Sequence, residues 1–423
     1  MRRRTVFAVA AGVVCFLGTL VSPVPARAAG GHTVYTYWDQ NEQQDFLTDH
    51  GGSGVLIPPY DANGQMCLFP DGSGRFVTGY NPTTDPTNPG YLLPTMQPPV
   101  GEAVWDAHGT FTGTTFYVPG PYMLPGQTVG GDIPPDPSGQ FNNNGTMTGC
   151  VFDRRGNLFA SDLGTAQGQY PAPNDGRLIE WFGPGYSTYC IVAGPTVGGV
   201  GPHHVDGTGG IRQPGMLALT PDGDLMVTEG GVRTGGLPAG TVVRVDRHSL
   251  PHSAADCGPD GLYPAAQLRT SIFFKGSLSL LPFPQGIARD QACNCWAIAS
   301  TIGNPAIAFF NDAGQLLSSP GEIPGEAISQ IGDPNGYNPF GIAFTPTGTA
   351  YFADIHLTCT APLTNCGPAN NGGQIMKVTF TNGVPSPATA VATGLNFPTS
   401  VTVCATRLYA NCPTAAPSAA GGG

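Results

Sequence analysis

One repeated pattern constrains the fold of this chain more than any other feature. Each copy contains a Pro-x-Gly turn or a close variant, an alternating apolar strand, a glycine turn and a second strand that ends in a polar residue. The plainest copy is residues 338–354, and others lie at 213–229, 283–299, 147–162 and 397–411, with a weaker one at 65–80. Period-2 alternation between glycine and proline predicts β-strands, and such units repeated along a chain are typical of a β-propeller.

The second half of each unit supports this interpretation. Residues 103–111 and 307–316 both have the pattern of strand, Asp/Gly turn and strand, whereas the last copy supplies only two strands. The missing hairpin is available near the start of the chain, in residues 32–46. Pairing of N- and C-terminal strands closes a ring and removes an open sheet edge. We therefore predict an all-β, six-bladed β-propeller, with seven blades as the alternative, in a single domain over residues 29–412.

The first 28 residues predict an export signal. Arg2, Arg3 and Arg4 form a basic region, residues 6–20 are apolar, and residues 26–28 are a small-x-small cleavage site. The apolar run is too short for a stable membrane span, so residues 1–28 are predicted to be a signal peptide and the mature protein to be secreted or otherwise extracytoplasmic. Residues 3–7 also loosely resemble a twin-arginine signal, which leaves the export route open. The tail at 413–423, rich in Pro, Ala and Gly, is predicted to be disordered.

Charge excludes two classes of partner. Only 11% of the residues are charged, which is too few for a coiled coil or a charge-rich disordered chain. Removing residues 1–28 takes away four arginines and no acids, so 13 basic and 28 acidic residues remain, a net charge of −15. Nucleic acids and anionic membranes both require clustered Lys and Arg. We therefore expect neither nucleic acid nor membrane as a partner.

Ten cysteines remain after residue 28, an even number that predicts up to five disulfides in an exported chain. Cys359 with Cys366, and Cys404 with Cys412, are close enough in sequence to close local loops. Cys293 and Cys295 are one residue apart on a predicted strand, so each is expected to find a distant partner. Metal binding by cysteine is the weaker interpretation, because the chain has no paired C-x-x-C motif.

The segment 338–354, followed by 373–378, resembles an NHL-type repeat, and the chain from 62 to about 411 resembles the six-bladed propellers that include SMP-30/gluconolactonase-like enzymes. In those enzymes the resemblance implies a calcium or zinc ion held by Glu, Asn and Asp at the starts of the innermost strands. The matching positions here lack a carboxylate or Asn; they are Gly64, Thr148, Gly215, Gln285, Phe340 and Thr399. Glu102 superficially resembles the Glu-bearing motif of that family, but it is predicted to lie on a third strand.

The ends of the second strands carry the acids Asp162, Glu229 and Asp354. In a propeller these ends share one face with the starts of the innermost strands, at the mouth of the central channel. Three acids on one face can bind a cation or act as acid and base. The alternative is that each carboxylate accepts backbone N–H groups of the following loop.

Long loops are predicted on that same face, at 163–176, 230–240, 355–373 and 193–213. They carry the histidines His203, His204 and His356, which together with nearby acids can ligate zinc or copper or serve as a general base. The alternative is that these are ordinary exposed loop histidines. Because such loops on a rigid scaffold usually carry binding sites, this face is the predicted functional face.

Three functions remain open at the level of the sequence. The first is a binding module for a small molecule, glycan or protein on the loop-rich face. The second is a metal-assisted hydrolase, lactonase-like enzyme or lyase, with calcium or zinc and with Asp162, Glu229, Asp354 and His356 or His204 as candidate residues. The third is a quinone-dependent dehydrogenase, because residues 221–229 resemble a blade of such enzymes.

Overall fold

The computed structural model describes residues 35–38, 64–80, 101–106, 111–117, 147–162, 176–194, 211, 214–229, 240–259, 261–277, 280–301, 305–317, 337–360, 365–368, 372–395 and 398–403. The predicted signal peptide (1–28) and tail (413–423) lie outside these residues, and both stay predictions, as does the single-domain boundary. In the part of the chain that is described, none of the helices has the length and apolar character needed to cross a bilayer.

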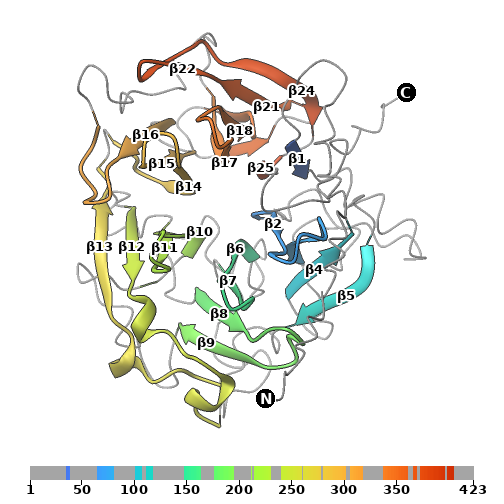
Figure 1. Ribbon diagram of the computed structural model, residues 1–423. Coiled ribbons are helices and arrows are strands. Elements are labelled where there is room, and N and C mark those ends of the chain that lie inside the picture. The colour runs from blue at the N-terminus through green and yellow to red at the C-terminus, as the bar shows by residue number, and fades with distance from the viewer. Residues whose placement is uncertain are drawn as a thin grey trace, which may run out of the picture.

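The described residues form a β-propeller of five blades (Figure 1). Each blade is an antiparallel sheet whose strands follow one another outward from the centre. The first two blades are β2 (Cys67–Leu68), β3 (Phe76–Tyr80), β4 (Gly101–Trp105) and β5 (Phe111–Tyr117), then β6 (Met147–Phe152), β7 (Leu158–Asp162), β8 (Arg177–Trp181) and β9 (Tyr189–Ala193).

The third and fourth blades are β10 (Pro214–Leu219), β11 (Leu225–Glu229), β12 (Thr241–Val245) and β13 (Thr270–Lys275), then β14 (Pro284–Asp290), β15 (Cys295–Ser300) and β16 (Ala306–Phe310). The fifth is β17 (Pro339–Phe344), β18 (Ala350–Asp354), β21 (Gly373–Val378) and β24 (Thr389–Leu395). It also carries two small hairpins, β19 (Leu357–Thr360) with β20 (Asn365–Pro368) and β22 (Phe380–Thr381) with β23 (Val384–Pro385). Between β12 and β13 lie three short 3₁₀ turns, Arg247–Ser249, Ala254–Asp256 and Ala265–Gln267.

The predicted number of six blades, like the alternative of seven, is wrong for the described residues. The last repeat contributes one strand there, β25 (Ser400–Val403), which pairs antiparallel with β1 (Tyr35–Trp38). The predicted second strand at 408–411 lies outside the described residues. In Figure 1 this two-stranded sheet sits between β17 and β2, and the amide of Met66 donates to Ser400 Oγ at 2.7 Å. The predicted pairing of N- and C-terminal segments is therefore present, but as a two-stranded sheet in place of a sixth blade.

The glycine of the Pro-x-Gly repeat is required where innermost strands meet. A Cβ at Gly341, on β17, would lie 2.7 Å from the carbonyl oxygen of Thr399 beside β25. The same backbones are joined by a hydrogen bond of 3.1 Å from the Gly341 amide to that oxygen. Only glycine lets two backbones approach this closely, so the repeated glycine is a packing requirement of the propeller centre.

Successive side chains of a strand point to opposite faces of the sheet, so they pack against the blades on either side. On β15, Cys295, Ala297 and Ala299 pack in the core shared with the fifth blade. Trp296 and Ile298 pack in the core shared with the third blade. Both faces of such a strand are buried, which explains why apolar residues occur on both phases of the alternation.

Three disulfides occur among the described residues. Cys67–Cys150 joins β2 to β6, and Cys190–Cys257 joins β9 to the segment that follows β12. Disulfides are typical of oxidising compartments. The expectation that Cys293 and Cys295 find distant partners is wrong, because they bond to each other. Asn294 between them has a left-handed φ of +54°, so the chain turns there instead of running on as a strand.

The other two predicted disulfides have different outcomes. Cys359 and Cys366 are directly opposed Cα partners across β19 and β20, and their bond stays a prediction. Cys404 and Cys412 lie outside the described residues.

Candidate functional site

The two ends of the propeller blades differ. At one end the first and second strands are joined by short turns, such as 153–157, 220–224 and 345–349, in which a hydrogen bond closes the turn; we call this the turn end. At the opposite end, each innermost strand begins and each second strand ends, followed by the connection to the third strand. We call this the connection end. The predicted loops 163–176, 230–240 and 355–373 all leave from the connection end.

At the connection end, the last residue of each of these second strands is directly opposed to a residue at the start of the third strand. Asp162 is the Cα partner of Arg177, Glu229 of Thr241 and Asp354 of Gln374. In the first blade Tyr80 opposes Gly101 in the same way. The intervening segments are 14, 11, 19 and 20 residues long for the second, third, fifth and first blades. The fourth blade has only residues 301–305 between Ser300 and Ala306.

Asp162 ends β7 as a fully buried residue, as the alternation of that strand requires. Its Oδ2 accepts from Arg177 Nε at 2.9 Å and from Nη2 at 2.6 Å, and the Arg177 side chain is 3% exposed. Two N–H donors of one guanidinium thus hold a single carboxylate oxygen of Asp162 by charge-assisted hydrogen bonds. The base of the 163–176 connection is thus held by a buried ion pair.

Asp354 ends β18 and is also fully buried. Its Oδ1 accepts from the backbone amides of Asn338 at 2.8 Å and His356 at 3.1 Å, and its Oδ2 accepts from Gln374 Nε2 at 2.9 Å. In the fourth blade Ser300 Oγ holds the equivalent position and accepts from the amide of Phe283 at 3.1 Å. Both polar groups tie the end of the second strand to the residue before the innermost strand.

The remaining predicted residues are placed as follows. Glu229 ends β11 and is 4% exposed, opposite Pro214 and Thr241. His356 is half-buried, with a left-handed φ of +48°. His203 and His204 lie outside the described residues. Among those that are described, Asp162, Glu229, Asp354 and His356 do not gather their ligand atoms into one cluster of metal-binding dimensions.

The centre of the connection end is filled by polar groups that bond to neighbouring strands. Thr148 Oγ1 donates to the carbonyl of Pro214 at 2.9 Å, and Thr399 Oγ1 donates to that of Gly64 at 3.0 Å. Gln285 is 1% exposed, and its Oε1 accepts no hydrogen bond within the described part of the chain.

Glu102 lies on β4, the predicted third strand, where burial raises its pKa well above the ordinary value.

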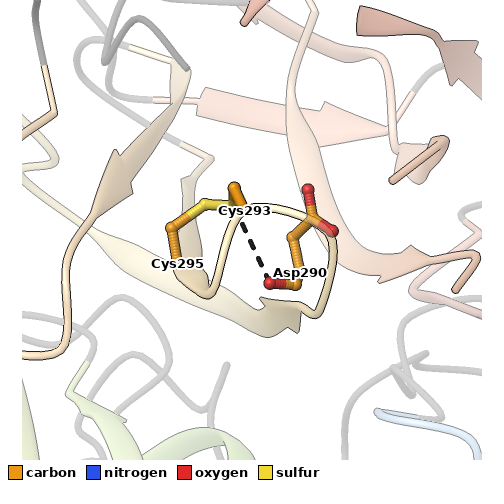
Figure 2. A group of neighbouring side chains, drawn as sticks. All are labelled: Asp290, Cys293 and Cys295. Atoms are coloured by element: carbon orange, nitrogen blue, oxygen red, sulfur yellow. Dashed lines mark hydrogen bonds between the residues drawn. A yellow bond between two sulfur atoms is a disulfide. The ribbon is translucent and has the colours of Figure 1, made fainter. Parts of the chain in front are cut away.

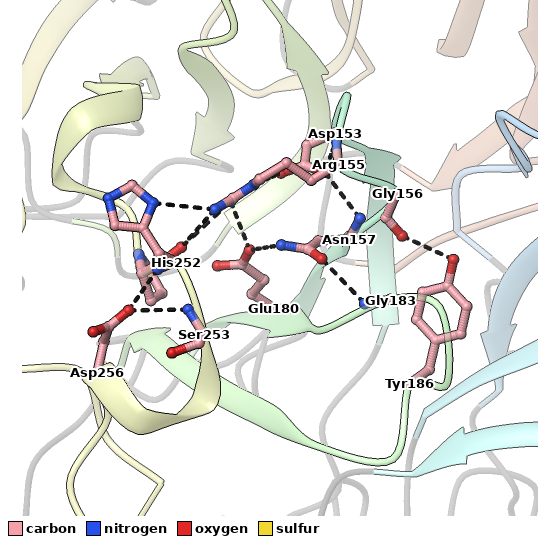
Figure 3. Close-up of polar contacts among 11 residues, drawn as sticks. Asp153, Arg155, Gly156, Asn157, Glu180, Gly183, Tyr186, His252, Ser253 and Asp256 are labelled. Carbon is pink, nitrogen blue, oxygen red and sulfur yellow. Dashed lines mark hydrogen bonds and ion pairs between the residues drawn. The ribbon is translucent and has the colours of Figure 1, made fainter.

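Sequence reasoning missed a buried glutamate near the turn end of the second blade. Glu180, on β8, is fully buried, and its Oε1 accepts from Asn157 Nδ2 at 2.7 Å and lies 3.1 Å from Arg155 Nη2 (Figure 3). Burial raises the pKa of Glu180 to about 8, against the opposing effects of Asn157 and Arg155. The same guanidinium reaches His252 Nδ1 at 3.2 Å, on the segment after β12. The sequence signal was the Asp-Arg-Arg-Gly-Asn turn at 153–157.

A second missed group lies at the turn end of the fourth blade. Asp290, Cys293 and Cys295 bring a carboxylate oxygen and two sulfur atoms within 4.8 Å of one another (Figure 2). Because the two sulfur atoms are joined in a disulfide, this group offers no thiolate ligand to a metal ion. The Cys-Asn-Cys motif was visible in the sequence, but the strand predicted there separated the two side chains.

A cleft of about 500 Å³ lies beside that turn, between the third and fourth blades. Its lining includes Arg244, Arg289, Asn294 and Asp312. Arg289 forms an ion pair with Asp312, and this hydrogen bond lowers the pKa of the carboxyl group. Trp296 Nε1 donates to the same carboxylate at 3.0 Å. The cleft is therefore polar, with its charges largely paired.

No family model and no curated protein matches the chain. Solved structures are similar to it, among them the following two. One is a gluconolactonase from Xanthomonas campestris, with 12% identity and a TM-score of 0.39, covering 82% of this chain and 84% of the other. The second is PorZ, a surface component of the type-IX secretion system of Porphyromonas gingivalis, with 11% identity and a TM-score of 0.39. That match covers 83% of this chain but spans only 36% of PorZ.

Proposed function

We propose that this protein is a binding module whose partner, a small molecule, glycan or protein, docks on the connection end of the propeller. The observation that carries the proposal is the length of the connections there. Antiparallel neighbours with directly opposed ends need only a turn of about two to five residues. The chain has 11 to 20 residues at four of these places, far more than connectivity requires.

Buried polar contacts hold the bases of two of these connections. Asp162 and Arg177 lock one base by a buried ion pair, and Asp354 locks another through three N–H donors. Segments displayed from fixed points on a rigid scaffold are where binding residues are usually found. The buried acids therefore support a binding surface without having to touch the ligand.

Charge limits the partner. The chain carries 17 basic and 28 acidic residues, a net charge of −11. An acidic surface favours neutral or basic partners and disfavours nucleic acids and anionic membranes. We therefore place neutral glycans and basic peptides first among the ligands to be tested.

The enzymatic alternatives have less support from the geometry. A metal-assisted hydrolase, lactonase-like enzyme or lyase would need free carboxylate oxygens, with calcium or zinc as the ion. Asp162 is bound by Arg177, and both oxygens of Asp354 already accept hydrogen bonds. The alternative of a quinone-dependent dehydrogenase has no described residue set that favours it.

The proposal is tested by shortening a connection while keeping its base. Residues 163–176 are replaced by Asn-Gly, which can join the opposed Asp162 and Arg177 without moving either strand. The parent protein and the variant are applied to an array of neutral oligosaccharides and basic peptides. We expect the parent to bind a defined class of probe and the variant to bind it at least about tenfold more weakly. A second variant shortens 230–240 between Glu229 and Thr241 in the same way.

The matched control is Asp71→Ala, on an exposed turn at the opposite end of the first blade. It should leave probe binding unchanged. Folded shortened variants that bind as well as the parent would contradict the proposal. So would a parent that binds no probe but hydrolyses glucono-δ-lactone when calcium or zinc is added.

A further inference from the structure

The disulfide between Cys293 and Cys295 can contribute less to the stability of the fold than the other two disulfides. Its cysteines are two positions apart, whereas those of the other two bonds are 67 and 83 apart. A disulfide stabilises a fold mainly by restricting the unfolded chain, and the effect grows with the length of the closed loop. The turn is also already held by strand pairing, since Asp290 and Cys295 are opposed Cα partners. Stability therefore explains this bond poorly.

The two cysteines of this bond differ in exposure. Cys293 is partly exposed, whereas Cys295 is 1% exposed. Asn294, between them, lines the cleft of about 500 Å³ between the third and fourth blades. Thiol–disulfide exchange requires that an incoming thiolate reach one sulfur atom in line with the bond, and the more exposed sulfur is attacked. Because Cys293 is the more exposed residue, it is the expected point of attack, with Cys295 as the leaving group.

A buried carboxyl group lies beside the bond. Asp290 is 0% exposed, and its Oδ1 accepts from the amide of Ala292 at 2.8 Å. Its Oδ2 is buried and has no hydrogen-bond partner within the described residues. Figure 2 shows Asp290 across the turn from the joined cysteines, and the backbone oxygen of Asp290 is 3.7 Å from Cys293 Sγ. The carboxyl group thus lies against the disulfide, with the backbone amides of Ala292 and Cys293 beside it.

We propose that Cys293 and Cys295 form a redox-active disulfide that exchanges with dithiols, and that Asp290 transfers the proton in that exchange. Burial raises the pKa of Asp290 above its ordinary value, so the group keeps its proton at higher pH than an exposed aspartate does. A protonated carboxyl group can serve as the acid for a departing thiolate, and its conjugate base can then deprotonate the next thiol.

The exchange balances with a dithiol as the reductant. A thiolate of the dithiol attacks Cys293 Sγ, the bond to Cys295 breaks, and the Cys295 thiolate takes the proton of Asp290. The second thiol of the reductant gives its proton to Asp290 and attacks the mixed disulfide. Cys293 leaves as a thiolate and is protonated by water. Two electrons have passed from the dithiol, which becomes a disulfide, to the cysteine pair, and Asp290 is again protonated.

The test is to reduce the disulfides of the full-length protein while it stays folded. The protein is equilibrated without denaturant in mixtures of reduced and oxidised dithiothreitol, free thiols are trapped with N-ethylmaleimide, and labelled peptides are identified by mass spectrometry. We expect Cys293 and Cys295 to be reduced while the other two disulfides stay intact, with a reduction equilibrium constant at least about 100-fold larger. The proposal fails if this pair is reduced together with the other two, or only when the protein unfolds.

A separate measurement, the rate of reduction, tests the role of Asp290. Asp290→Asn keeps the Oδ1 acceptor but cannot transfer a proton, so we expect its reduction rate, corrected for thiolate concentration, to fall at least about tenfold below that of the parent at the acid end of a pH series. Asp71→Asn, on the equivalent turn of the first blade, is the control and should react as the parent does. An unchanged rate in Asp290→Asn overturns the role of Asp290. If that variant does not fold, the parent's rate, corrected for thiolate concentration, must fall as pH rises; a flat profile overturns it as well.

A parallel reaction with a reduced Cys-x-x-Cys oxidoreductase at equal thiol concentration distinguishes the source of the dithiol. A faster reaction than with dithiothreitol identifies a protein dithiol that fits the cleft. Equal rates identify a small-molecule dithiol.

Discussion

Asp162 and Arg177 are directly opposed at the connection end of the second blade, and their buried side chains form an ion pair with 2.6 Å between Nη2 and Oδ2. Fourteen residues of chain begin and end at this pair. The pair therefore fixes both ends of the connection that we propose to carry binding residues.

Removing one partner of this pair should destabilise the protein strongly. Asp162→Ala leaves the Arg177 guanidinium buried without its carboxylate, which typically costs about 3–5 kcal/mol. The double variant Asp162→Leu with Arg177→Met removes both charges and should recover most of that loss. Urea unfolding of the three proteins measures the effect. A single variant as stable as the parent would show that the pair does not hold the base of the connection.

Asp354 should behave as a hydrogen-bonding group. Asp354→Ala leaves the amides of Asn338 and His356 without their acceptor, at a cost of about 1–3 kcal/mol for each buried donor left unpaired. Asp354→Asn retains one carbonyl oxygen and should cost less. Thermal unfolding gives the order parent, Asn, Ala. If Asp354→Ala were as stable as the parent and lost a bound ion, the cation-binding interpretation would replace this one.

Glu180 should make stability depend on pH. Its pKa of about 8 in the folded protein exceeds the ordinary value of 4.5, so the folded state binds the proton more tightly than the unfolded state. Stability from this group is complete below about pH 4.5 and is lost as pH rises towards 8. Glu180→Gln has no proton to lose, so its unfolding free energy should fall less over that range, by an amount on the order of a few kcal/mol.

Urea unfolding of parent and variant at pH 5, 6, 7 and 8 tests this prediction. The two curves of unfolding free energy against pH should converge at the acid end and separate at the alkaline end, with the variant above. Parallel curves would mean that Glu180 is ionised throughout, held by Arg155 at 3.1 Å.

The three disulfides should contribute unequally to stability. Chain-entropy estimates give roughly 4–5 kcal/mol for closing the Cys67–Cys150 loop and less than about 2 kcal/mol for Cys293–Cys295. Replacing each pair by alanine and measuring the unfolding midpoint should show a large fall for the first and a small one for the second. A large fall on losing Cys293–Cys295 would make that bond a structural one.

Much of the fold could be predicted because the blades repeat. Strands such as β7 and β15 are short and apolar on both phases, a pattern set by burial between two neighbouring blades. The number of blades could not be predicted as well. One strand pairing, between β25 and β1, takes the place of a full sixth blade, and the alternating residues of β1 do not reveal how many further strands accompany it.

The sites were less predictable than the strands. The long connections follow from the positions of Asp162, Glu229 and Asp354 in the repeat, and these positions were found. Glu180 was missed because its surroundings come from two separate segments, the turn that carries Arg155 and Asn157 and the segment that carries His252. The bond between Cys293 and Cys295 was missed because it depends on the left-handed conformation of one residue, Asn294, which no alternation pattern encodes.

The contact between Met66 and Ser400 joins residues 334 positions apart, and Thr399 reaches Gly64 over a similar span. A ribosome makes the later partner only after nearly all of the other described strands exist. The blades in between can stack in the order of synthesis, since each touches mainly its neighbour. The circle cannot close before the residues around Ser400 have been made, and those residues join its two ends. A chain that ends before them lacks β25, so it loses the contacts of that strand with β17 and β18 as well as the hydrogen bonds to Met66 and Gly64.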